Sequence, residues 1–445
     1  MVIRLVLVGF NLHANIILLT ISSTLVSFIY TDMTLSTHIR KLIPAALLLV
    51  PMMLHAQWFG SKSDMINTLR AISNGDWERP QIITLDSDET IEFSFDEMSH
   101  LYHRFTYHIT HCDAQWKPSN LIESEYMNGF NDQPIENWEN SLNTTFDYTH
   151  YSLTLPNDDV TLKLSGNYRL SISEDGKEVA WFRFMIVEDK HNLSATVDGN
   201  TDIDSHKSHQ QVNMAVSLNG LNVTHPESEI YTVVMQNRRF DNAVLNPKPT
   251  YNAGNRLTYE HCRDLIFPAG NEFRRFEIVN MYDYFKNVDR VTFHDPYYHA
   301  TLMEDTRHHA YTFDHDHNGR YLIRYNQASN SDTEADYLFV HFNLASEPLT
   351  SGKMYVSGHF NGGNLSSKYE MEYNSRDKAY QATVLLKMGA YDYQYLWVPD
   401  DENAGQTKPA EGDWYETRNE YLILLYYRQR GSRYDRLVST LSMEQ

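Results

Sequence analysis

The chain has 445 residues, a length that favours two to four domains over a single core. Hydrophobic residues make up 42% and charged residues 21% of the sequence, a globular composition that excludes a disordered chain. The formal net charge of −21 argues against nucleic acid and anionic lipid as partners, because binding to either depends on Lys and Arg.

Two apolar segments precede residue 57. The first covers residues 2–30, and a second module begins at Met33 with a basic stretch (His38, Arg40, Lys41), an apolar stretch over residues 42–54 and the small residue Ala56. This layout is typical of a secretory signal peptide. We therefore predict a signal peptide at residues 33–56 and an over-extended start at residues 1–32. The alternative is a membrane anchor formed by the first segment. No apolar run of spanning length follows, so the processed chain is not expected to be an integral membrane protein.

Apolar and polar residues alternate from residue 80 onward, which is the period of a β-strand. Ile91, Phe93 and Phe95 alternate with Glu92 and Ser94, and the pattern returns at residues 105–109, 168–172 and 182–186. We predict an all-β protein of tandem immunoglobulin-like β-sandwich domains, the first at residues 57–190. A long aromatic loop at residues 114–148 is inserted between its strands.

Strand-like segments continue to the end of the chain and predict a middle β domain at residues 191–345. A third sandwich is predicted at residues 346–430, followed by a C-terminal tail at 431–445. The strings MYVSGHFN (354–361) and YQATVLLKMGAYDYQYLWVPD (380–400) resemble early-set immunoglobulin domains related to glycogen-binding modules. Such modules stack sugars on an exposed aromatic residue, whereas here Gly362 and Gly363 follow Phe360 and Asn361. A periplasmic carbohydrate-binding accessory protein stays open as an alternative function.

The two cysteines, Cys112 and Cys262, are too few for a disulfide framework. A single bridge between them would tie the first domain to the second, and two separately buried thiols are the alternative. His111 beside Cys112 offers an imidazole and a thiol for nucleophilic chemistry. However, adjacent residues on a strand point to opposite faces, which argues against an activated pair.

Residues 314–319 read DHDHNG and match the first half of a calcium loop, with Asp314, Asp316 and Asn318 as candidate ligands. The bidentate glutamate that completes such a loop is absent, because Tyr325 stands at the twelfth position. A plain hairpin turn uses the same residue types. The sequence contains no phosphate loop, dinucleotide fingerprint or metalloprotease helix. We therefore predict no enzyme activity, no cofactor and no small-molecule substrate.

Several longer strings of the first domain resemble the N-terminal domain of the type 9 secretion system plug proteins of the Bacteroidetes. They include FSFDEM (93–98), HITHCDAQWKPS (108–119), EYMNGF (125–130), SLNTTFDYTHY (141–151) and LSGNYRL (164–170). The similarity is specific over about residues 80–187 and continues more loosely to about residue 430.

The resemblance implies a non-catalytic periplasmic protein, peripherally associated with the outer membrane. It would bind the translocon barrel of that system and close the barrel's periplasmic mouth. Aromatic side chains are common anchors at protein interfaces. The candidates for partner contact, or for ordering the inserted loop, are Trp116, Tyr126, Phe130, Trp138, Tyr148 and Tyr151.

Overall fold

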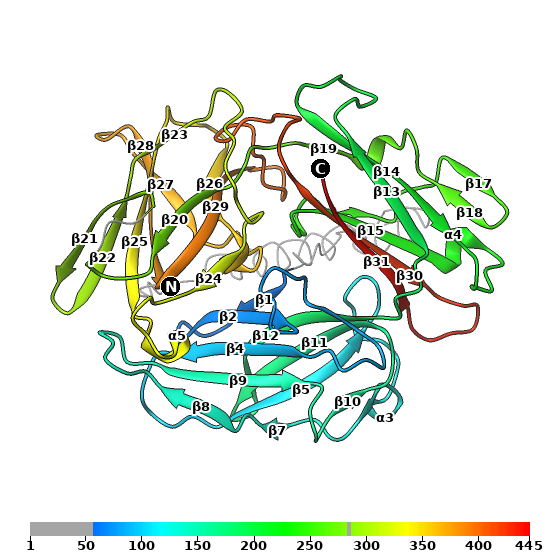
Figure 1. The fold of residues 1–445 in the computed structure, drawn as a ribbon, viewed down its shortest axis with the longest axis horizontal. Coiled ribbons are helices and arrows are strands. Elements are labelled where there is room, and N and C mark those ends of the chain that lie inside the picture. The colour runs from blue at the N-terminus through cyan, green and yellow to red at the C-terminus, as the bar shows by residue number, and fades with distance from the viewer. Residues whose placement is uncertain (1–56, 283–285) are drawn as a thin grey trace, which may run out of the picture. The chain divides into compact units, whose positions relative to one another are not determined.

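The computed structural model describes residues 57–282 and 286–445, and over this range the protein is built from β-sheets joined by turns and single-turn helices (Figure 1). The predicted all-β class is confirmed. The immunoglobulin-like and early-set types of the individual sandwiches stay predictions. The signal peptide at residues 33–56 and the extension at residues 1–32 lie outside the described residues.

The first sandwich consists of two sheets. The first contains, in spatial order, β1 (Phe59–Ser61), β12 (Lys177–Val187), β11 (Gly166–Glu174), β5 (Phe105–Cys112) and β7 (Gln133–Pro134), with β3 (Ile82–Thr84) pairing with β12. The second contains β2 (Ile66–Ser73), β4 (Ile91–Glu97), β9 (Thr149–Leu155) and β8 (Asn137–Asn140). Aromatic rings from both sheets fill the space between them. Phe93 of β4 contacts Phe182 and Phe184 of β12 at ring distances of 5.4 and 5.2 Å.

Two further sheets combine residues of the middle region with the C-terminus. One contains β13 (Leu193–Asp198), β14 (His209–Ser217), β18 (Arg256–Thr258) and β17 (Tyr251–Ala253), with β19 (Ile266–Pro268) also pairing with β14. The other contains β16 (Val244–Leu245), β15 (Ile230–Gln236), β30 (Glu420–Tyr427) and β31 (Arg436–Glu444). The short helices of this region are α4 (Pro226–Glu229) and η2 (Arg263–Leu265).

Strand β30 explains why the C-terminus returns to the middle region. Its sequence EYLILLYY is apolar almost throughout, and every residue of it is buried. Leu422, Leu424 and Tyr426 pack into the core of the first sandwich. Ile423 and Leu425 pack into a separate core, to which β14 contributes. A strand with a continuous apolar run suits a position that is covered on both faces.

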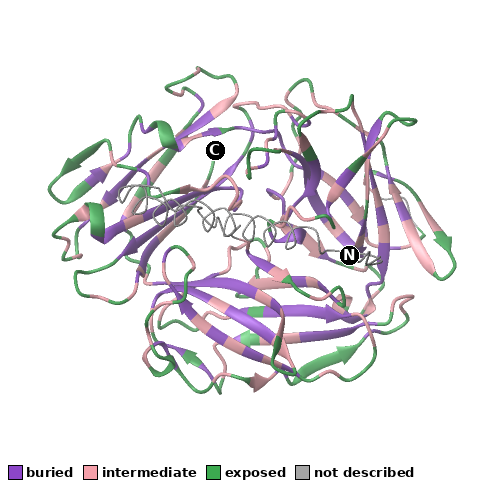
Figure 2. Cartoon of the chain, turned by 180° about the vertical axis from the view of Figure 1, so that it is seen from behind, coloured by how far each residue is buried: buried purple, intermediate pink, exposed green. Residues whose placement is uncertain are grey.

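The remaining strands form a ten-stranded sheet. In spatial order they are β20 (Arg274–Ile278), β29 (Gly389–Pro399), β26 (Gly352–Ser357), β27 (Glu370–Asn374), β28 (Ala379–Lys387), β25 (Tyr337–Ala345), β22 (Tyr297–Leu302) and β21 (Val288–His294). β23 (Asp305–Thr306) pairs with β25 and β24 (Tyr321–Ile323) pairs with β29. The short helices are α5 (Ser331–Glu334) and η3 (His359–Asn361). Figure 2 shows buried residues along the strands and exposed residues mainly at turns and strand ends.

Strand pairing crosses the boundary expected between residues 345 and 346. Strands from both sides of it share the ten-stranded sheet, and β15 pairs with β30 along its whole length. Residues 431–445, expected as a tail, contain β31, which pairs with β30. The local alternation of apolar residues indicated β15 and β30 but not β31, and it carries no information about which distant strand is the partner.

Candidate partner-binding surface

The inserted segment of residues 114–148 is folded onto the edges of the first sandwich. It contains helix α3 (Glu123–Tyr126) and strand β6 (Met127–Asn128), which pairs with β10 (Thr161–Leu162). Strand β7 then pairs with β5 of one sheet, and β8 pairs with β9 of the other. Between them Ile135 is buried, and its N–H donates to the carbonyl of Phe105. The segment thus passes from one sheet edge to the other and closes that side of the sandwich.

Exposed apolar side chains are concentrated in and around this segment. Fourteen large hydrophobic side chains are exposed among the described residues, and six of them lie between residues 101 and 142: Leu101, Tyr102, Ile122, Phe130, Trp138 and Leu142. Phe130 is 77% exposed and Tyr102 68% exposed. All six come from a stretch of 42 residues, and exposed aromatic side chains are common anchors at protein interfaces.

The rings of Tyr102 and Trp138 contact each other with centroids 5.8 Å apart. Trp138 belongs to the edge strand β8, all four residues of which are exposed, and lies opposite the buried Tyr151 of β9. It therefore occupies the rim of the core, with 43% of its surface exposed. We call Leu101, Tyr102, Phe130 and Trp138 the sandwich rim.

Three of the six aromatic residues singled out by the sequence lie in the interior. The hydroxyl of Tyr126 donates to the carbonyl of Ile109 at 2.9 Å, and Tyr151 stacks on Phe95 at 5.3 Å. Tyr148 is fully buried and donates to the carbonyl of Ala335 at 2.8 Å. These three side chains order the segment and are not part of the exposed surface.

Trp116 has an intermediate position. It packs edge-on against Trp58 and Phe240, and the guanidinium of Arg183 lies 4.9 Å from the centre of its ring. Arg183 is itself buried, and its Nη1 donates to the carbonyl of Gln57 at 3.0 Å. Trp116 therefore contributes to the contact between the first sandwich and the loop after β15.

A buried polar cluster joins the first sandwich to the ten-stranded sheet. Asp96 of β4 accepts hydrogen bonds from Lys387 Nζ at 2.6 Å, Tyr337 Oη at 2.6 Å and His150 Nδ1 at 2.7 Å. Both Asp96 and Lys387 have side chains with no exposed surface. The ring of Tyr148 lies over Lys387 Nζ at 4.1 Å. We call Asp96, His150, Tyr337 and Lys387 the Asp96 cluster.

Burial and the neighbouring groups of the cluster shift the pKa of Asp96 in opposite directions. Burial by itself raises the pKa of Asp96, but the charge of Lys387 and the hydrogen bond from His150 lower that pKa to about 2. Burial lowers the pKa of Lys387. The cluster combines two cross-strand pairs, Asp96 with His150 and Tyr337 with Lys387. The cluster could not be predicted from sequence, because Asp96 and Lys387 are 291 positions apart.

Cys112 and Cys262 are both free and buried, so the disulfide between the first and second domains is absent from the structure. Cys112 lies at the end of β5, whereas Cys262 belongs to the separate core to which β14 contributes. Burial raises the pKa of the Cys112 thiol to about 12, and burial lowers the pKa of His111 to about 4. A neutral thiol beside a neutral imidazole is not an activated nucleophile.

The loop at residues 314–319 connects β23 to β24. Asp314 forms an ion pair with Lys286 at 2.8 Å, while Asp316 accepts hydrogen bonds from the backbone N–H groups of Phe273 and Asn318. Asn318 adopts a left-handed conformation, with φ of 52°. Within residues 57–282 and 286–445, no three His, Cys, Asp or Glu side chains are grouped as metal ligands. The arrangement is that of a turn.

Phe360 belongs to the string that resembles glycogen-binding modules. It is 8% exposed and contacts Tyr369 and Tyr391. It belongs to the core of the ten-stranded sheet and offers no stacking surface.

The fold and its first sandwich define the class of protein. The sequence matches the family model of the type 9 secretion system plug protein first domain over residues 66–188, which is the first sandwich described above. The crystal structure of a hypothetical protein from Parabacteroides merdae is similar over 87% of this chain and 99% of that chain, with 41% identity and a TM-score of 0.85. No curated protein of similar sequence was found.

Residues 66–188 thus match the first domain of the type 9 secretion system plug proteins. The resemblance inferred from the sequence is thereby confirmed, and the chain is connected with type 9 secretion and with the cell envelope. The family is a secretion-system plug family and not a known enzyme family. In the part of the chain that the structure describes, no helix has the length and apolar character needed to cross a membrane.

Proposed function

We propose that the protein is a non-catalytic periplasmic plug. It binds the outer-membrane translocon barrel of the type 9 secretion system and closes the barrel's periplasmic mouth. The observation that carries this proposal, beside the family, is the concentration of exposed apolar side chains between residues 101 and 142. Uncovered aromatic groups on a folded protein favour a protein partner, because their burial supplies most of the binding free energy at interfaces.

The sandwich rim suits a docking surface because ordered structure supports it from behind. Tyr126, Tyr148 and Tyr151 fix the inserted segment from inside, so little conformational entropy is lost when a partner binds. The Asp96 cluster holds this sandwich against the ten-stranded sheet. A plug must resist deformation by the pore that it closes, and a single body with buried polar contacts between its parts meets that requirement.

Affinity purification of the tagged full-length protein from envelope membranes tests partner identity. We expect the translocon barrel to be the main co-purifying protein, and its absence from the purified material would contradict the proposal. A strain without the barrel provides the control, because the protein should then be recovered alone and in the periplasmic fraction.

Closure of the pore has a separate readout. Deletion of the plug should leave the barrel open and raise the entry of large antibiotics that the outer membrane normally excludes. Complementation with the wild-type gene should restore exclusion. Unchanged antibiotic entry in the deletion strain, with barrel levels confirmed, would contradict closure and leave the binding proposal standing.

The periplasmic location is tested by N-terminal sequencing of the protein isolated from cells. We expect the mature chain to begin at Gln57. An intact Met1 segment in the inner membrane would contradict the predicted signal peptide.

A further inference from the structure

A hollow of about 240 Å³ lies on one face of three neighbouring strands of the ten-stranded sheet. β29 is in the middle, with β20 and β24 paired on its two sides. Alternate residues of a strand share a face, and the residues of this face line the hollow. They are Arg275 and Glu277 from β20, Ala390 and Asp392 from β29, and Leu322 from β24 with its neighbours Arg320 and Arg324.

The small side chain of Ala390 lies on the central strand, between Glu277 of β20 and Leu322 of β24, and Arg275 lies opposite Asp392. The opposite face of the same strands is rigid, because Tyr391 stacks on Phe276 at 5.1 Å and on Tyr321 at 5.4 Å. This aromatic ladder fixes the spacing of the three backbones. The hollow is therefore a preformed groove with arginine side chains along both sides.

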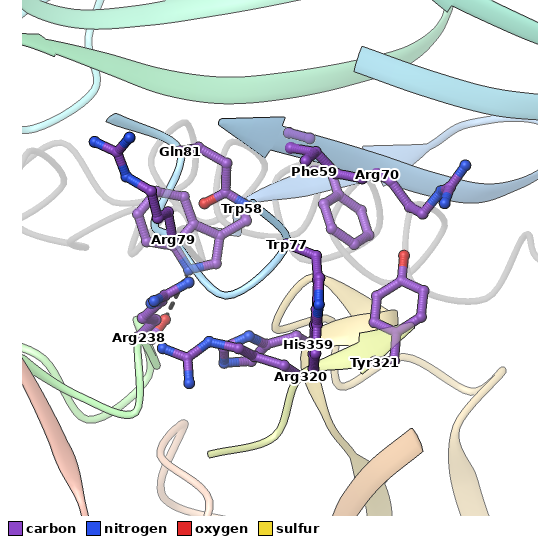
Figure 3. A pocket seen from close by; sticks show the side chains of 12 residues that line it. Trp58, Phe59, Arg70, Trp77, Arg79, Gln81, Arg238, Arg320, Tyr321 and His359 are labelled. Atoms are coloured by element: carbon purple, nitrogen blue, oxygen red, sulfur yellow. Dashed lines mark hydrogen bonds between the residues drawn. The ribbon is translucent and has the colours of Figure 1, made fainter. Parts of the chain in front are cut away.

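A second cavity, of about 50 Å³, adjoins the groove, and Trp77 and Arg320 line both. Figure 3 shows the side chains that line this second cavity. It is lined on its other sides by Arg70, Arg79 and Arg238, together with aromatic side chains. We call the groove and this cavity together the arginine cleft. Its arginines are Arg70, Arg79, Arg238, Arg275, Arg320 and Arg324.

Arginines outnumber acidic residues among those that line the cleft, in a protein whose formal net charge is −21. The only acidic residues among those that line it are Glu277 and Asp392. Both of them form ion pairs with Arg275 at 3.3 Å, and burial raises the pKa of Asp392. The acids that pair with Arg70, Arg79, Arg238 and Arg320 do not line the cleft.

Several donors of the cleft have unused hydrogen-bonding capacity. Arg320 is 8% exposed, and its Nε is buried without a hydrogen-bond partner in the protein. Arg320 and Arg238 share one carboxylate, that of Glu420, so this buried trio carries a net positive charge. Arg324 is exposed and forms no ion pair among the described residues. A buried positive excess is costly unless an anion compensates it.

We propose that the arginine cleft binds an extended acidic peptide segment. Guanidinium groups form bidentate hydrogen bonds with carboxylates, and alternate residues of an extended peptide would direct their carboxylates to one side of the groove. The groove, of about 240 Å³, and the adjoining cavity, of about 50 Å³, have room for single side chains of such a peptide. The acidic remainder of the protein disfavours a polyanion as dense as nucleic acid. This inference does not depend on the proposed plug function.

Fluorescence anisotropy with a labelled hexaglutamate peptide tests the proposal on the full-length mature protein. We expect saturable binding that weakens as salt rises from about 50 mM to about 300 mM, because ions screen the exposed part of the cleft. A labelled hexaglutamine peptide should not bind. Absence of saturable hexaglutamate binding would overturn the proposal, and so would equal or tighter binding of a single-stranded oligonucleotide or of free glutamate.

Two variants locate the site. Arg324→Gln removes an exposed arginine that has no ion pair, and it should weaken peptide binding by roughly tenfold, the effect of one charge-assisted contact. Ala390→Leu leaves the charge unchanged and fills the floor of the groove, so it should weaken binding at least as much. Arg256→Gln, at an exposed arginine of β18, is the matched control. Equal losses in Arg256→Gln and Arg324→Gln, or unchanged binding in Ala390→Leu with a native circular dichroism spectrum, would overturn the proposal.

Discussion

The sandwich rim and the arginine cleft differ in how the chain assembles them. The rim is apolar, and its members come from one stretch between residues 101 and 138. The cleft is rich in arginine and is built from segments at residues 58–81, 238, 275–279, 317–326, 359 and 390–392. A contiguous surface can be recognised from its residues, whereas an assembled one becomes visible only when the strand pairing is known. The Asp96 cluster lies at the junction between the sandwich and the sheet that carry these two surfaces.

The largest effect is expected from breaking this junction. Lys387→Met leaves Asp96 buried without its main counter-charge, and we expect the free energy of unfolding to fall by about 3–5 kcal/mol. Denaturant unfolding followed by circular dichroism measures the change. Lys353→Met is the matched control, since Lys353 pairs with Glu370 at the surface and its loss should cost less than about 1 kcal/mol. A similar small loss for both variants would show that the cluster does not stabilise the junction.

The same cluster predicts a pH dependence. The folded pKa of Asp96 is about 2, below the unfolded value of about 3.9, so its stabilisation is complete above pH 4 and disappears as pH falls toward 2. The difference corresponds to about 2–3 kcal/mol. Unfolding measured between pH 5 and pH 2 should show a shallower loss for Asp96→Asn than for the wild type. Parallel curves would contradict the assignment.

At the sandwich rim the expected effect is on binding and not on folding. Trp138→Ala should weaken binding to the translocon barrel by about 2 kcal/mol, because an exposed aromatic anchor is lost. Thermal unfolding should change little, since 43% of the Trp138 side chain is already exposed. Biolayer interferometry on the purified barrel gives the affinity. An unfolded variant, or an unchanged affinity, would mean that Trp138 has a structural role in the sandwich and no role in barrel binding.

The smallest effect is expected at Cys112. Because its thiol is free, buried and neutral, Cys112→Ser should lower stability by about 1 kcal/mol and leave barrel binding unchanged. Reducing agents should have no effect on either quantity. Loss of binding on reduction alone would revive the disulfide with Cys262.

Sequence periodicity predicted the strands well, because local alternation such as that of Ile91, Phe93 and Phe95 directly reflects the two faces of a sheet. It could not show that β30 packs between two cores, because partner choice is a long-range property. For a similar reason, the sequence could not show which of the aromatic candidates are exposed and which are buried. Phe130 and Trp138 are exposed, whereas Tyr148 is covered by residues of the ten-stranded sheet nearly 200 positions away. Burial of a side chain by such distant residues has no local signature.

The most direct test of the plug account is the affinity of the full-length protein for the detergent-solubilised barrel. It compares the Tyr102→Ala/Trp138→Ala double variant with Tyr251→Ala, which removes an aromatic side chain of similar exposure (66%) from β17. We expect the double variant to lose at least about thirtyfold in affinity, equivalent to about 2 kcal/mol, and the control to bind as the wild type does. Equal affinities for all three proteins, each with a native circular dichroism spectrum, would contradict docking through the sandwich rim.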